Sequence, residues 1–188
     1  MRILTVRQPW AWAIIHGGKD VENRPRNIAG SYRGPVAIHA GLTYDKDSHE
    51  RSQTLRDAQD RAAVALGAEV FSHGYLWDLD APDPREQWSL MGHIIGVVDL
   101  VDVHSASVIG GCGRIQHDCD EHPNGCRHHC SPWAMGPAPE GWYQHLVFEN
   151  PRALDEPIPY TGALGLRNLA VRSPEVVLDI NRQIGATS

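Results

Sequence analysis

The sequence predicts a single α+β domain, in which residues with helical spacing alternate with short apolar runs typical of strands. Four residues recur at three- and four-residue intervals, as on one face of a helix: Trp10, Ala13, Ile14 and Gly17. Apolar runs at residues 36–40 and 91–102 have the composition of buried strands. With 188 residues, the chain is long enough for one domain with a sizeable core.

The N-terminal region is expected to pass from a short helix directly into extended chain. Pro9 suits the first turn of the helix, where its missing N–H removes no hydrogen bond. Gly17 and Gly18 can end the helix, and Pro25 ends the strand that follows. Side chains alternate along a strand, which gives two sets: Asp20, Glu22 and Arg24 on one side, and Lys19, Val21 and Asn23 on the other.

Residues 42–90 are interpreted as an insertion between strands. Good helix formers and an incomplete apolar stripe predict a helix from about Asp45 to Leu66, closed by the glycine that follows. The acidic, proline-containing segment at residues 76–87 is expected to form a loop that covers one end of the fold. Trp77 and Trp88 could flank a pocket, although a tryptophan is more often a core anchor.

The charge of the chain is uneven. The net charge of −6 at pH 7 argues against a protein that coats nucleic acid along its length. Residues 1–40, however, hold six Lys/Arg and two Asp/Glu, a net +4, which fits a local site for a few phosphates. Because the sequence lacks an apolar stretch typical of a membrane span or a secretory signal, we expect a cytoplasmic protein with no membrane partner.

A Cys- and His-rich loop is expected at about residues 110–130. It holds all four cysteines, Cys112, Cys119, Cys126 and Cys130, and four interspersed histidines, His117, His122, His128 and His129. Since a cytoplasmic chain rarely keeps disulfides, the run indicates a structural zinc site formed by the four cysteines, or by three of them and one histidine. Free thiols, an adventitious metal and disulfides are the alternatives, because paired C-x-x-C motifs are absent.

The segment Gly17-x-Lys19-x-x-Glu22-x-Arg24 matches the G-x-K-x-x-E-x-R signature of ASCH domains (activating signal cointegrator homology), which belong to the PUA-like superfamily. Similar blocks at residues 8–11, 32–40, 92–100 and 149–166 support the same assignment. Together with the signature, they extend the resemblance to this family over about residues 1–41, 91–104 and 131–170. The resemblance implies a PUA-like β-barrel with flanking helices. It also implies that the motif lies in a cleft suited to RNA or a nucleotide.

One branch of the family is similar to amidohydrolases that remove the acetyl group from N4-acetylcytidine. In that branch a lysine and a threonine carry the chemistry. Lys19 matches the lysine, whereas Glu22 stands where the threonine would be. The resemblance therefore implies, for an enzyme, hydrolysis of an acylated nucleobase with Lys19 as base or proton shuttle. Glu22, which takes the place of the threonine, is the other candidate catalytic residue.

The residues expected to bind a nucleic acid or nucleotide are Gln8, Trp10, Lys19, Glu22, Arg24, His39 and Trp133. Lysine and arginine bind phosphate, and a base can stack on tryptophan. Structural roles compete: an ion pair of Glu22 with Arg24, core packing of Trp10, and a core position for His39. Three functions follow: binding of single-stranded RNA or a modified nucleotide, which is favoured; a nucleoside-directed amidohydrolase; and an interaction scaffold without a ligand.

Overall fold

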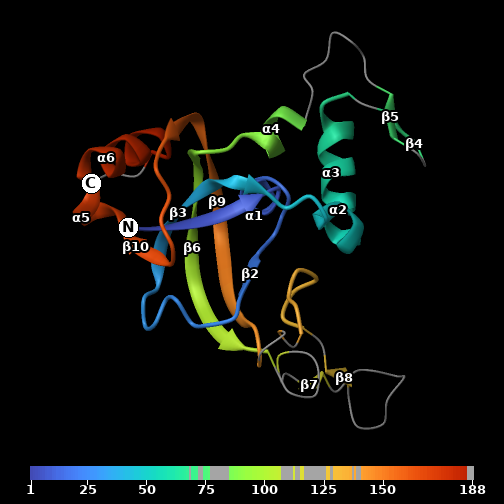
Figure 1. The fold of residues 1–188 in the computed structure, drawn as a ribbon, viewed down its shortest axis with the longest axis horizontal. Helices are drawn as coiled ribbons and strands as arrows, with labels where there is room; N and C mark the ends of the chain where they lie inside the picture. The colour runs from blue at the N-terminus through green and yellow to red at the C-terminus, as the bar shows by residue number, and fades with distance from the viewer. Residues whose placement is uncertain are drawn as a thin grey trace. The chain divides into compact units, whose positions relative to one another are not determined.

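The computed structural model describes residues 1–67, 69–71, 74–76, 85–106, 112, 115–116, 126–127, 129–136, 138 and 141–185. Six strands form one mixed sheet in the order β10-β1-β3-β6-β9-β2 (Figure 1). They are β1 (Arg2–Gln8), β2 (Val21–Arg24), β3 (Gly34–Tyr44), β6 (His93–Ser105), β9 (Gln144–Pro159) and β10 (Leu166–Asn168). Two short pairs are β4 (Glu69–Phe71) with β5 (Gly74–Leu76), and β7 (Ile115–Gln116) with β8 (Cys126–Arg127).

The helices of the described residues are α1 (Trp10–Ile15), α2 (Ser48–Arg51), α3 (Gln53–Ala65), α4 (Arg85–Ser89), α5 (Leu169–Arg172) and α6 (Pro174–Gln183). The predicted α+β class is confirmed by this set of elements. Within the described parts of the chain, no helix has both the length and the apolar character that a membrane crossing needs.

The main sheet is open and does not close into the expected barrel; its edges are β10 and β2 among the described strands. β1 pairs in parallel with β3 and antiparallel with β10, and β2 pairs antiparallel with β9. The two edge strands have only 3 and 4 residues. Such short edges offer few backbone groups for pairing with one another.

The chain divides into two compact units. Unit 1 comprises Met1–Lys19, Pro35–Val98 and Asn150–Ser188, and unit 2 comprises Asp20–Gly34 and Asp99–Glu149. The long strands β6 and β9 contribute residues to both. The signature segment is also divided, since Gly17 and Lys19 belong to unit 1 whereas Glu22 and Arg24 belong to unit 2.

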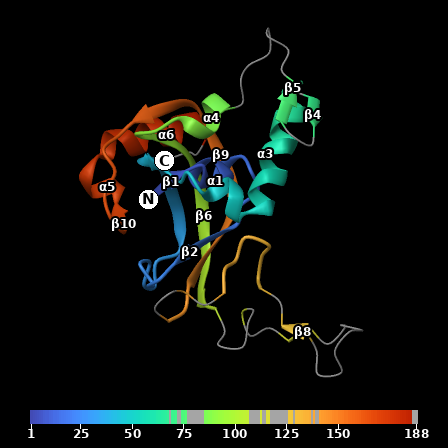
Figure 2. The ribbon, with the colours of Figure 1, turned by 45° about the vertical axis from the view of Figure 1, so that its right-hand side comes forward.

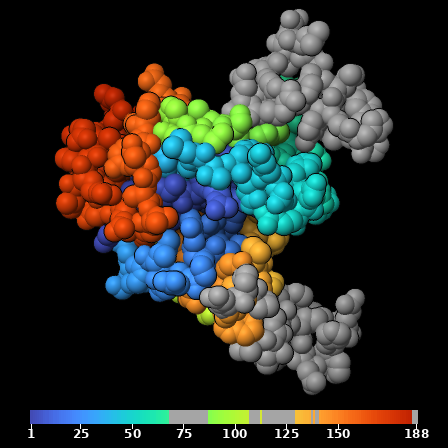
Figure 3. Space-filling model, in the orientation of Figure 1, coloured from blue at the N-terminus to red at the C-terminus, as the bar shows by residue number. Residues whose placement is uncertain are grey.

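Unit 1 has an apolar core shared by its strands and C-terminal helices. The core residues are Ile3, Ala37, Ile94, Val97, Leu154, Leu169 and Ile180. Both ribbon views show α5 next to β10 and α6 next to α5, and Figure 3 shows this C-terminal region as a red surface (Figures 1–3). Burial of a large aliphatic side chain contributes about 1.5–3 kcal/mol, so this cluster is a main source of the stability of unit 1.

The predicted N-terminal helix is confirmed as α1, with one local difference. Pro9 occupies the N-cap position instead of the first helical position. Gln8 supplies the capping acceptor, because its side-chain oxygen accepts a hydrogen bond from the Trp12 N–H at 3.0 Å. After the helix, Gly17 permits a close approach, since a Cβ there would lie 2.9 Å from the Cα of Ala13. Local sequence therefore determines both ends of α1.

The prediction of a single helix from Asp45 to Leu66 is wrong in one respect, because the segment forms two helices, α2 and α3. The break falls at Ser52, which has extended backbone angles and whose Oγ accepts from the Leu55 N–H at 3.1 Å. Serine favours such an N-cap position over a helix interior.

The loop predicted at 76–87 lies largely outside the described residues, and its last residues belong to α4. Trp77 also lies outside them. Trp88 is a core anchor, because it is buried and packs edge-on against Trp12 with ring centroids 5.3 Å apart.

Candidate metal centre

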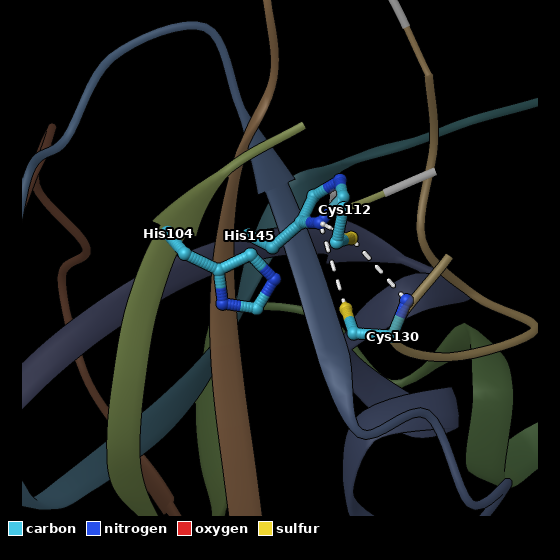
Figure 4. Close-up of side chains that lie close together, drawn as sticks. All are labelled: His104, Cys112, Cys130 and His145. Carbon is cyan, nitrogen blue, oxygen red and sulfur yellow. Dashed lines mark hydrogen bonds between the residues drawn. The ribbon is translucent and has the colours of Figure 1, made fainter. Parts of the chain in front are cut away.

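Four side chains of unit 2 form a group with the donor atoms of a metal site. His104 comes from β6, His145 comes from β9, and Cys112 and Cys130 come from the chain between these strands (Figure 4). One donor atom from each residue lies within 4.8 Å of all the others. Two thiols and two imidazoles are a donor set that binds Zn²⁺ in tetrahedral geometry.

His104 is oriented by the carboxylate of Asp102. The Nδ1 of His104 lies 2.7 Å from Asp102 Oδ2. This hydrogen bond is the largest of the causes that lower the pKa of Asp102. The carboxylate is therefore the acceptor, and Nδ1 of His104 carries the proton. Nε2 is buried and has no hydrogen-bond partner among the described residues. It is therefore the atom that His104 can offer to a metal, as in the carboxylate–histidine pairs of known metal sites.

His145 is oriented in the complementary way. It is fully buried, and its Nε2 donates a hydrogen bond to the Met135 carbonyl oxygen at 2.8 Å. Its Nδ1 consequently carries a lone pair and lies 3.1 Å from Cys112 Sγ and 3.5 Å from Cys130 Sγ. Zinc–ligand bond lengths place nitrogen and sulfur roughly 3.6 Å apart in a tetrahedral site. Both histidines thus direct an unprotonated nitrogen toward the same place.

The two cysteines are free thiols, not a disulfide. The backbone N–H of Cys130 donates to Cys112 Sγ at 3.2 Å. Burial, followed by the neighbouring Cys112 and Asp20, raises the pKa of the Cys130 thiol to about 12. Two adjacent sulfurs cannot both become thiolates cheaply, whereas a bound divalent cation deprotonates its thiol ligands.

The structure brings together part of the ligand set that the sequence predicts. Cys112 and Cys130 were expected, and both belong to the group. The side chains of Cys119, Cys126, His117, His122 and His128 lie outside the described residues. His129 lies nearby, with its ring centroid 6.0 Å from that of His145, but it is not in the group.

Sequence reasoning missed His104 and His145. A signal was available, because both histidines stand in apolar segments that flank the cysteine-rich run, and Asp102-x-His104 places a carboxylate and an imidazole on one side of a strand. The ligands predicted from the sequence all come from the run itself, whereas the group in the structure also includes residues near the ends of β6 and β9.

In unit 1, Lys19 and Trp10 lie together. Lys19 is only 4% exposed, and its Nζ lies 5.9 Å from the centroid of the half-buried Trp10 ring. The indole Nε1 donates to Asp45 Oδ2 at 2.9 Å, which fixes the ring. The arrangement joins a cation to an aromatic surface, with a cation–π attraction of about 0.5–2 kcal/mol.

In unit 2, the other two residues of the signature form an ion pair on β2. Arg24 Nε lies 3.1 Å from Glu22 Oε1, and the side chains are 28% and 12% exposed. Alternation along a strand places residues two apart on the same face, which explains the pair. The extended segment that the sequence predicts after α1 is confirmed, because residues 21–24 form strand β2.

The remaining predicted binding residues are buried. Gln8 is fully buried, and its Nε2 donates to the Leu90 carbonyl oxygen at 2.7 Å. His39 is 1% exposed, and its Nε2 donates to the Tyr160 carbonyl oxygen at 2.9 Å. Trp133 is 9% exposed. The position of His39 agrees with the core role that competed with binding in the sequence interpretation, whereas no structural role was predicted for Gln8 or Trp133.

Comparison of the chain with protein-family models and with curated proteins found no match.

Proposed function

We propose that unit 2 binds one zinc ion through His104, Cys112, Cys130 and His145, and that the ion has a structural role. The observation that supports this is the orientation of both imidazoles. Each has one nitrogen hydrogen-bonded to an oxygen, while Nε2 of His104 is buried and Nδ1 of His145 lies 3.1 Å from Cys112 Sγ. Four protein ligands leave no position open for substrate, which is typical of structural zinc. Two thiolates balance the charge of the cation.

The test is elemental analysis of protein purified without added metal, followed by thermal unfolding with and without a chelator. One zinc per chain and a lower melting temperature after chelation are expected, because metal that binds only the folded state adds to stability. Metal-free protein with an unchanged melting temperature would refute the proposal.

We further propose that the protein binds single-stranded RNA or a modified nucleotide through the ASCH-like segment from Gly17 to Arg24. The supporting observation is the pair of Lys19 and Trp10, in which an ammonium lies over an aromatic ring. A lysine can contact a phosphate, and stacking of a base on an aromatic ring contributes roughly 1–3 kcal/mol. The net +4 of residues 1–40 agrees with an anionic ligand.

Binding of short single-stranded RNAs and single nucleotides, measured by fluorescence anisotropy at several salt concentrations, tests this proposal. Lys19→Ala, Lys19→Met and Arg24→Ala are expected to weaken binding and to lower the salt slope by about one for each lost phosphate contact. Lys46→Ala is the matched control, because Lys46 is an exposed lysine outside the segment. Affinity and slope that stay unchanged in folded Lys19 and Arg24 variants would contradict the proposal.

An amidohydrolase acting on N4-acetylcytidine or a similar acylated nucleobase is the second candidate. The near-complete burial of Lys19 favours it, since desolvation is one way in which a lysine becomes reactive. The test is turnover of N4-acetylcytidine by the wild type and by Lys19→Met, followed by chromatography. Turnover that survives the substitution would exclude Lys19 as the base. Absence of both binding and turnover would favour an interaction scaffold.

A further inference from the structure

Strand β2 is held to the metal-binding loop by side chains. Asn23 lies between Glu22 and Arg24, and its Nδ2 donates to the Trp133 carbonyl oxygen at 2.9 Å. In return, the Met135 N–H donates to Asn23 Oδ1 at 2.8 Å. The hydroxyl of Ser131 donates to Asp20, the residue directly before the strand. All of these residues belong to unit 2.

The same loop is part of the metal centre. Ser131 directly follows the ligand Cys130, and the Met135 carbonyl accepts the hydrogen bond that orients His145. Met135 is therefore bonded on one side to a metal ligand and on the other to Asn23. The backbone agrees, because Asn23 is directly opposite His145 in the β2–β9 register.

β2 depends on these side-chain bonds more than an interior strand would. It has four residues, stands at the sheet edge and pairs only with β9 among the described strands. A short edge strand has a low local unfolding free energy unless other contacts hold it. Loss of the metal would release Cys130 and His145, and with them the loop that carries the partners of Asn23 and Asp20.

We propose that Asn23 is a positioning residue that couples the metal centre to strand β2, so that zinc occupancy sets the order of the strand that carries Glu22 and Arg24. This inference rests on the proposed zinc site. If Glu22 and Arg24 contact a ligand, zinc and that ligand strengthen each other's binding by the same factor, as linkage requires.

Hydrogen exchange of the β2 amides tests the coupling without any RNA. In zinc-loaded wild type, addition of a chelator is expected to speed exchange of residues 21–24 by at least about 5-fold, the lower range of site-to-site coupling. Zinc-loaded Asn23→Ala is expected to exchange at nearly the chelated wild-type rate, and chelation should add little more. Asn27→Ala is the matched control, because Asn27 caps its own loop through the Ala29 and Gly30 N–H groups.

The coupling can also be measured in the opposite direction, as the effect of Asn23 on the affinity for zinc. Asn23→Ala is expected to bind zinc at least about 5-fold more weakly than Asn27→Ala. Unchanged β2 exchange on chelation of a zinc-loaded wild type would overturn the coupling and leave the zinc site intact. The coupling would also be overturned if Asn23→Ala sped the exchange of the β2 amides by the same factor with and without zinc. A wild type that binds no zinc would overturn the coupling together with the zinc site.

Discussion

The two compact units differ in whether a candidate metal centre adds to their buried side chains. Both units bury apolar and polar side chains, such as Ile94 and His39 in unit 1 and Leu146 and His145 in unit 2. The four candidate metal ligands, however, all belong to unit 2. Apolar burial stabilises without regard to direction. Buried polar groups stabilise only when each has a correctly placed partner. Unit 1 is therefore expected to tolerate loss of the metal, whereas the order of unit 2 depends on it.

The largest expected effect is loss of the metal from unit 2. His145→Ala and Cys130→Ser should reduce zinc to near zero per chain, removing a binding free energy of order 10–16 kcal/mol at pH 7. Hydrogen exchange should then speed at residues 99–106 and 144–149 but not in the core segment 36–40. His49→Ala, at an exposed position of α2, should retain zinc. Uniform loss of protection along the whole chain would show that the units do not differ in this way.

The next effect concerns the aliphatic core of unit 1. Ile94→Ala removes a fully buried side chain and should cost about 2–5 kcal/mol of unfolding free energy. Denaturant unfolding should give a similar loss in zinc-loaded and chelated protein. Val64→Ala, at a position that is 57% exposed, is the control and should change stability by less than about 0.5 kcal/mol. A loss that appears only with zinc would contradict the separation of the two cores.

A smaller effect is expected from Asp102, which orients His104 without being a ligand. Asp102→Asn should weaken zinc affinity by about 10- to 100-fold, the usual cost of losing the acceptor behind a ligating histidine. Competition with a chromophoric chelator measures this affinity. Asp155→Asn, at an exposed position of β9, should leave it unchanged. Equal affinities in the two variants would mean that Asp102 has no such role.

The smallest effect is a pH dependence in unit 1. Burial lowers the pKa of His39, while the Tyr160 carbonyl opposes this in part. When the pH drops below about 6.5, the pKa of histidine in the unfolded chain, the unfolded chain takes up a proton that the folded chain does not. The unfolding free energy therefore decreases as the pH decreases. Between about pH 7.5 and 5.5, the unfolding free energy of the wild type should fall more than that of His39→Gln. Parallel pH profiles would exclude His39 as the cause.

Local patterns of the sequence were sufficient for the elements near the N-terminus. The spacing from Trp10 to Gly17 predicted α1, and the apolar run at residues 36–40 predicted the centre of β3. The break at Ser52 was missed, because a serine in a polar helical segment can be an interior residue or a cap. An eight-residue signature could be located, but its division between two compact units could not be read from spacing.

The sequence by itself determined the α+β class, the elements with clear periodicity and the place of Cys112 and Cys130 among the candidate metal ligands. Periodicity and local composition carry that information within a few neighbouring residues. Only the tertiary structure decided that His104 and His145 complete the group and that Asn23 contacts the same loop. These contacts depend on which strands become neighbours and in which register, and strand pairing is settled by the packing of the whole sheet.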